Sequence, residues 1–125
     1  MKQALIVGFG GFLGTIARWL LGGFILHRAP NLKFPLGTFT INILGCLLIG
    51  LLAGFAERRG SFSPELRLFL FTGICGGFTT FSAFAHENVF LLRRGEMATS
   101  LLYVTGSVIA GLLAVWIGFR SIPQP

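Results

Sequence analysis

Four long apolar blocks constrain the fold of this chain more than any other feature. They cover about residues 4–26, 37–56, 66–91 and 97–119. A helix needs about 20 apolar residues to cross a hydrocarbon core of about 30 Å, and each block reaches that length. The stretches between the blocks, HRAPNLKFP, ERRGSFSPE and RRGE, are short and rich in turn formers and charge. We therefore expect one all-α membrane domain over residues 1–125, with four transmembrane helices.

Charge is too scarce for a water-facing surface. The chain has ten Lys and Arg, four Glu and no Asp among 125 residues, whereas globular chains carry roughly 25% charged residues. A net charge of +6 could indicate nucleic acid, but the basic residues are spread beside the apolar blocks and form no patch. No paired carboxylates, catalytic triad or metal cluster can be assembled from the residues. We expect a lipid bilayer around the protein, no nucleic acid partner and no enzyme activity.

The basic residues are balanced between the two sides of the membrane. With four spans, one side carries Lys2, Arg58, Arg59, Arg67 and Arg120, and the other carries Arg18, Arg28, Lys33, Arg93 and Arg94. An excess of Lys and Arg on one side normally sets the orientation of a membrane protein. Its absence predicts insertion in both orientations and an antiparallel homodimer. Two inverted copies would supply the symmetry that many transporters build from inverted repeats.

The third block contains GICGGFTTFSAF at residues 73–84, an unusual composition for a span. Its three glycines weaken a helix, so we expect the helix to break near its middle. The hydroxyls of Thr79, Thr80 and Ser82 can satisfy backbone groups that a break releases. Carbonyls at the end of one half can hold a cation, and N–H groups at the start of the next can hold an anion.

Polar side chains recur at helical spacing in the other spans. Thr38 and Asn42 share a face of the second span, and Tyr103 and Ser107 share a face of the fourth. Phe81 and Phe84 also share a face and can offer positive ring edges to an anion. For the hydroxyls, an interhelical hydrogen bond explains the pattern as well as a pore does. Asn42 favours a functional role because its amide is costly in a membrane.

These motifs together resemble the Fluc (CrcB) family of fluoride channels. The likeness covers essentially the whole chain and rests on GGFLGTIARW, PLGTFTINILG, GICGGFTTFSAFAHE, Tyr103 and Ser107. It implies passive fluoride export across a bacterial inner membrane, which would confer fluoride resistance. It also implies a dual-topology antiparallel homodimer with two pores, in agreement with the balanced basic residues.

The resemblance further implies roles for individual residues. The pore residues would be Phe81, Phe84, Asn42, Ser82, Tyr103, Ser107 and Thr38, and the vestibule residues Glu87 and Arg18. The backbone carbonyls of Gly76 and Thr79 would hold a structural Na⁺ at the dimer interface. Two positions depart from the family pattern: Ala83 stands where many relatives have Thr, and Gly111 where the polar track can continue with Ser. Both bear on conduction rate more than on identity.

Two other functions remain open at this point. Small multidrug-resistance type transporters also have four helices, a similar length and dual topology. They rely on a carboxylate in the first helix, whereas the first acidic residue here is Glu57. A small structural or assembly subunit without transport is the third possibility, and the helix break and the polar residues argue against it.

Overall fold

Four long helical segments make up the computed structural model, which describes residues 1–60 and 62–125. They are α1 (Lys2–Arg28), α2 (Leu36–Arg59), a third span over Pro64–Arg93 and α6 (Met97–Ser121). Within the described ranges, these four segments are the ones long and apolar enough to cross a membrane. The predicted spans are thus confirmed, and each end differs from the prediction by at most three residues.

The third span consists of several pieces. It contains α3 (Pro64–Arg67), the π-helical segment η1 (Leu68–Cys75), α4 (Gly76–Phe78) and α5 (Phe81–Arg93). Ser63 caps its start by accepting the Leu66 N–H, and Pro64 follows at a position where its missing N–H costs nothing. Thr79 and Thr80 have extended backbones. The predicted interruption near the middle of this span is therefore confirmed.

The glycines do not cause this interruption, and in that respect the prediction was wrong. Gly73, Gly76 and Gly77 are all helical, and the break follows them. A Cβ atom on Gly77 would lie 2.5 Å from the carbonyl oxygen of Gly11, and one on Gly73 2.9 Å from the Cα of Gly10. These two glycines instead allow the backbone of the third span to approach α1.

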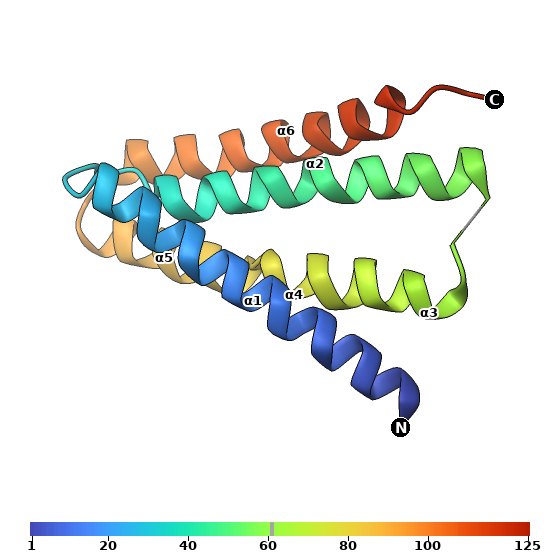
Figure 1. Cartoon of the computed structure of the whole chain (residues 1–125). Coiled ribbons are helices and arrows are strands. Elements are labelled where there is room, and N and C mark those ends of the chain that lie inside the picture. Colours follow the sequence, from blue (N-terminus) through green and yellow to red (C-terminus); the bar gives the residue numbers. More distant parts are fainter. Residues whose placement is uncertain (61) are drawn as a thin grey trace.

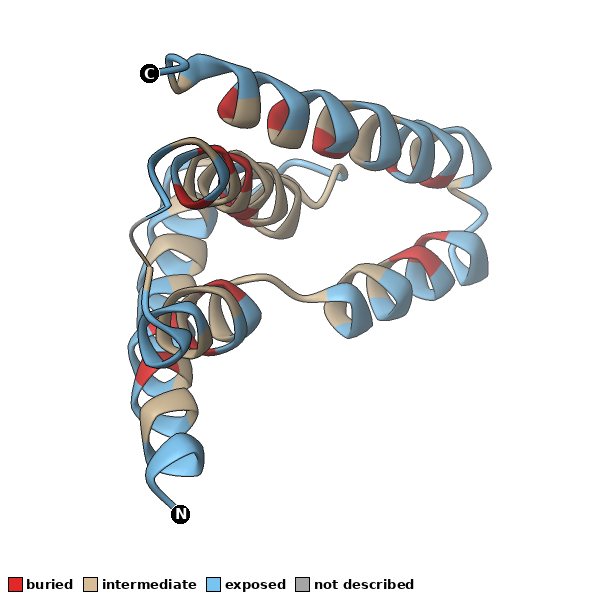
Figure 2. Ribbon diagram, turned by 90° about the vertical axis from the view of Figure 1, so that its right-hand side faces the viewer, coloured by how far each residue is buried: buried red, intermediate tan, exposed pale blue. Residues whose placement is uncertain are grey.

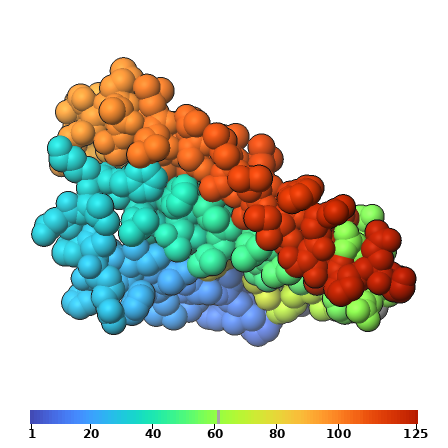
Figure 3. All heavy atoms as spheres, turned by 90° about the horizontal axis from the view of Figure 1, so that it is seen from above, coloured from blue at the N-terminus to red at the C-terminus, as the bar shows by residue number. Residues whose placement is uncertain are grey.

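The break gives the two halves of the third span different neighbours. The first half, α3 to α4, packs on α1, whereas α5 is displaced and lies along α6 (Figure 2). Helices α2 and α6 run side by side for most of their length (Figure 1), and their atoms adjoin in the space-filling view from above (Figure 3). The chain thus forms two helix pairs, α1 with the first half and α2 with α6, while α5 reaches across to α6.

Small residues make both pairs close. A Cβ on Gly14 would clash with the carbonyl oxygen of Ile74, and one on Gly50 with that of Val115. Gly54 faces Phe119 in the same way, with 2.6 Å from an added Cβ to its carbonyl oxygen. Gly10 with Gly14 and Gly50 with Gly54 thus form small-xxx-small pairs, whose spacing lets the helix backbones approach closely.

We expect Gly14→Ala to destabilise the protein by about 1–3 kcal/mol, the usual cost of adding a methyl group to a full interface. Thermal unfolding of the purified protein in detergent measures the change. Gly8→Ala is the matched control on α1, because a Cβ on Gly8 meets no atom within 4 Å. Equal unfolding temperatures for the two variants would contradict the close contact between α1 and the third span.

Candidate ion pathway

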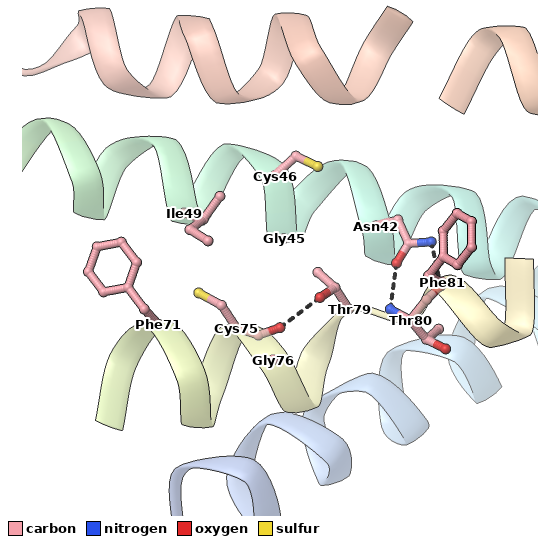
Figure 4. A pocket seen from close by; sticks show the side chains of 10 residues that line it. All are labelled: Asn42, Gly45, Cys46, Ile49, Phe71, Cys75, Gly76, Thr79, Thr80 and Phe81. Carbon is pink, nitrogen blue, oxygen red and sulfur yellow. Dashed lines mark hydrogen bonds between the residues drawn. The ribbon is translucent and has the colours of Figure 1, made fainter. Parts of the chain in front are cut away.

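Asn42 supplies the hydrogen bonds that hold the break in the third span. Its Nδ2 donates to the carbonyl oxygen of Thr80 at 3.0 Å, and the N–H of Thr80 donates to its Oδ1 at 2.9 Å (Figure 4). One side chain of α2 thus satisfies both backbone polar groups of a residue outside any helix. Unsatisfied groups at membrane depth cost several kcal/mol each, so this pair of bonds is what makes an extended Thr80 tolerable.

The threonine hydroxyls also bond to backbone groups at the break, as predicted. The Oγ1 of Thr79 donates to the carbonyl oxygen of Cys75 at 2.8 Å (Figure 4). The Oγ1 of Thr80 accepts the Ala83 N–H at 3.2 Å and so caps the start of α5. The Oγ of Ser82 lies 3.4 Å from the Thr80 hydroxyl.

The same bonds redirect N–H groups away from two carbonyls. In a continuous helix the Thr80 N–H would bind the Gly76 carbonyl, and the Ala83 N–H would bind the Thr79 carbonyl. Here these N–H groups donate to Asn42 and to the Thr80 hydroxyl. Gly76 and Thr79 both line a groove of about 340 Å³ beside α2 (Figure 4). Two neutral carbonyl oxygens at such a groove are ligands of the kind that a Na⁺ ion prefers.

A polar cluster further along α5 joins three spans. The Oγ1 of Thr38 donates to Oε1 of Glu87 at 2.5 Å, and the hydroxyl of Tyr103 donates to Oε2 at 3.2 Å. Tyr103 is the largest completely buried side chain among the described residues. The resemblance implies a vestibule role for Glu87, and its carboxylate bonds directly to two of the residues expected in the pore.

Aromatic rings connect this cluster to the break. The ring of Phe84 meets that of Tyr103 edge to face at 4.9 Å between centroids, and Phe81 follows at 5.6 Å from Phe84. Phe81 is 80% exposed. Phe34, in the segment between α1 and α2, also meets the ring of Tyr103 edge to face, with 5.2 Å between ring centroids. Phe81 and Phe84 thus lie between the break and the Glu87 cluster.

Ser107 has a buried hydroxyl without a protein partner in the described part of the chain. It lies one turn beyond Tyr103 on α6, on the same face. Arg18, by contrast, is half-buried and lines a groove of about 530 Å³ with Thr38, Thr80 and Ser82. The structure therefore connects Thr38, Glu87, Tyr103, Phe84 and Phe81 to one another, and Arg18 lines a groove together with Thr38 and Ser82.

Two polar residues at this site, Asn88 and Ser100, were missed from the sequence. Both are buried, and the Ser100 hydroxyl donates to Asn88 Oδ1 at 2.9 Å. An asparagine within an apolar span was the available signal, the same one that identified Asn42.

The chain matches known proteins over nearly its whole length. The sequence profile of the family described as "CrcB-like protein, Camphor Resistance (CrcB)" matches residues 5–119. This chain belongs to the CrcB family. The "Fluoride-specific ion channel FluC" of Methylobacillus flagellatus is 47% identical over 98% of this chain and 95% of its own length. Proteins of the same name from Flavobacterium psychrophilum and Rhizobium meliloti are 44% and 45% identical, each over 94% of both chains.

Membership of the CrcB family confirms the resemblance found from the sequence motifs. It also agrees with the expectation that the chain is not an enzyme, because the named relatives are ion channels. With four apolar spans and this family, the chain is a multi-pass membrane protein.

We expect Asn42→Leu to lower the free energy of unfolding by about 1–3 kcal/mol, because both backbone groups of Thr80 lose their partner. Amide hydrogen exchange of Thr80 should also become faster in the variant. Asn31→Leu, at an exposed position between α1 and α2, is the control and should change neither quantity. Unaltered exchange at Thr80 in Asn42→Leu would show that Asn42 does not hold the break.

Proposed function

We propose that this CrcB family member is a fluoride-selective channel that exports F⁻ passively across a bacterial inner membrane. The observation that carries the proposal is the continuous set of side chains from Phe81 through Phe84 to Tyr103, Glu87 and Thr38. These side chains belong to α5, α6 and α2, and they offer ring edges and hydroxyl donors. The names of the curated relatives support fluoride as the ion.

The chemistry of these groups suits a small, strongly hydrated anion. Such an ion crosses only if donors replace its water at close range. Ser107 is such a donor, because its buried hydroxyl has no partner among the described residues. Thr38, Tyr103 and Asn42 offer further O–H and N–H groups, and Ser82 lies at the start of the path. No Lys or Arg is among these residues, so a bound anion is not held too tightly to leave.

Glu87 then has a definite place on the path. Its two carboxylate oxygens occupy the point where the Thr38 and Tyr103 hydroxyls converge. Fluoride accepts the same hydrogen bonds as a carboxylate oxygen. Fluoride can therefore use these donors only when the Glu87 side chain releases them. Arg18 lines a groove that also contains Thr38.

The proposal includes an antiparallel homodimer in which residues 1–125 of each copy form a single membrane domain. A four-helix chain this small encloses no pore of its own, and Phe81 is 80% exposed in the single chain. Balanced basic residues support insertion in both orientations. The Gly76 and Thr79 carbonyls would hold Na⁺ at the interface, and they fit this role because the break redirects their usual N–H partners. That ion would join the two copies at their broken helices.

The other two functions explain these observations less well. A small multidrug-resistance type transporter requires a carboxylate in the first helix, and α1 contains no Asp or Glu. A purely structural subunit gives no reason for a buried serine hydroxyl on α6 that has no partner among the described residues.

The direct test is efflux of fluoride and chloride from liposomes that contain the purified protein, recorded with ion-selective electrodes. We expect fluoride efflux far above that of protein-free liposomes, and a sharp reduction in Phe81→Ile and Asn42→Ala with the dimer retained. Phe12→Ile, at an exposed position on α1, is the control and should conduct normally. Lack of fluoride efflux from the unaltered protein would overturn the proposed function, and normal flux in both pore variants would show that the path lies elsewhere.

The variant Ser107→Ala should affect fluoride flux without affecting stability. We expect fluoride flux to fall by about tenfold or more, since a hydrogen bond to a charged group contributes about 1.5–3 kcal/mol. The free energy of unfolding should not fall, because the hydroxyl has no protein partner to lose. Ser121→Ala, at the exposed end of α6, is the control. A loss of stability without a loss of flux would assign Ser107 to packing.

A further inference from the structure

A buried polar pair connects α5 to α6 beside the proposed path. The Ser100 hydroxyl donates to Asn88 Oδ1 at 2.9 Å, and Asn88 Nδ2 donates to the carbonyl oxygen of Phe84 at 2.9 Å. Asn88 is 8% exposed and Ser100 4%. Among the described residues, the bond from Ser100 to Asn88 is the only side-chain to side-chain hydrogen bond in which both residues are buried.

Because α5 lies beyond the break, its rotation about its own axis must be fixed by side-chain hydrogen bonds such as the one between Ser100 and Asn88. The break separates α5 from the first half of its span, so helix continuity does not fix its rotation. Figure 2 shows α5 set apart from the other half and lying along α6. Apolar packing gives little orientation in lipid, because the tails are as apolar as the side chains. Directional hydrogen bonds therefore decide which face of α5 is turned toward α6.

The Asn88 and Ser100 pair lies on the same faces as the ion-path contacts. Asn88 follows Glu87 and stands one turn beyond Phe84, and Ser100 stands one turn before Tyr103. Both Glu87 and Phe84 reach Tyr103 across this interface. Any rotation of α5 that breaks the Asn88 bond would also move the carboxylate and the ring away from Tyr103.

We propose that Asn88 and Ser100 are positioning residues for ion conduction: they set the rotation of α5, and thereby place Phe84 and Glu87 on the ion path. The proposal rests on the proposed fluoride channel function. Neither residue needs to touch the ion. The amide at position 88 accepts from Ser100 through Oδ1 and donates to the Phe84 carbonyl through Nδ2, and a leucine side chain can do neither.

Four variants test this role in the liposome assay: Asn88→Leu, Ser100→Ala, their double variant and Ser100→Thr. We expect each of the first two to lower fluoride flux about three- to tenfold, the range that one interhelical hydrogen bond in a membrane supports. The double variant should be no slower than Asn88→Leu, since the bond is already lost. Ser100→Thr keeps the hydroxyl and should restore flux, and the fluoride-to-chloride ratio should fall wherever flux falls. Asn31→Leu and Thr105→Val, both at exposed positions, are the matched controls.

Rotation of α5 can also be followed without fluoride. His86 is exposed on α5, so His86→Cys in a chain with Cys46→Ser and Cys75→Ser provides a maleimide-labelling site. Asn88→Leu should change the labelling rate, and Thr105→Val should not.

Normal flux and selectivity in both single variants, or independent losses that multiply in the double variant, would overturn the positioning role. Reduced flux with an unchanged ion ratio and unchanged labelling would overturn it too. If the unaltered protein conducts no fluoride, the proposed function fails, and an unchanged labelling rate would then also refute the rotation of α5.

Discussion

The two hydrogen bonds between Asn42 and Thr80 are the interaction on which the rest of the structure depends. Backbone groups at membrane depth must find partners inside the protein, and an extended Thr80 finds both on one side chain of α2. Without these bonds the third span would gain stability as a continuous helix. The displacement of α5, the redirected N–H partners of Gly76 and Thr79, and the groove beside them all follow from the break.

The break also divides the third span into two halves, which pack on their neighbours through different kinds of contact. The first half contacts α1 through backbone, at glycines where no side chain fits. The second half contacts α2 and α6 through directional side-chain bonds, at Glu87 and Asn88. A backbone interface gives a rigid support, whereas side-chain donors and acceptors can exchange partners. The groups that we propose to conduct fluoride lie on this second half, where hydrogen-bond partners can exchange.

Residue type and spacing were enough to predict the four spans, the existence of the break and the use of threonine hydroxyls there. They could not show that the break follows the glycines. A glycine in a span can mark either a weak point in the helix or a close contact with another helix, and the sequence does not distinguish the two. Gly73 and Gly77 serve packing because Gly10 and Gly11 of α1 lie opposite them. That contact depends on the tertiary structure and cannot be read from the third span alone. Asn88 and Ser100 escaped notice for a similar reason. The asparagine stood out within an apolar span, but its pairing with Ser100 depends on how α6 turns back along α5.

Two of the four glutamates form ion pairs near the ends of the spans. Glu65 and Glu96 form ion pairs with Lys2 and Lys33 at 3.8 and 2.9 Å, at span ends where water screens them and each pair contributes at most about 1 kcal/mol. Lys33 precedes Phe34, whose ring covers Tyr103, so the ion pair with Glu96 ties this segment to the turn between α5 and α6. Helix α5 is thus held by Thr80 at its start, by Tyr103 and Ser100 along its length, and by an exposed ion pair beyond its end. Since the exposed pair is the weakest of the three, the buried bonds to α2 and α6 determine where α5 stands.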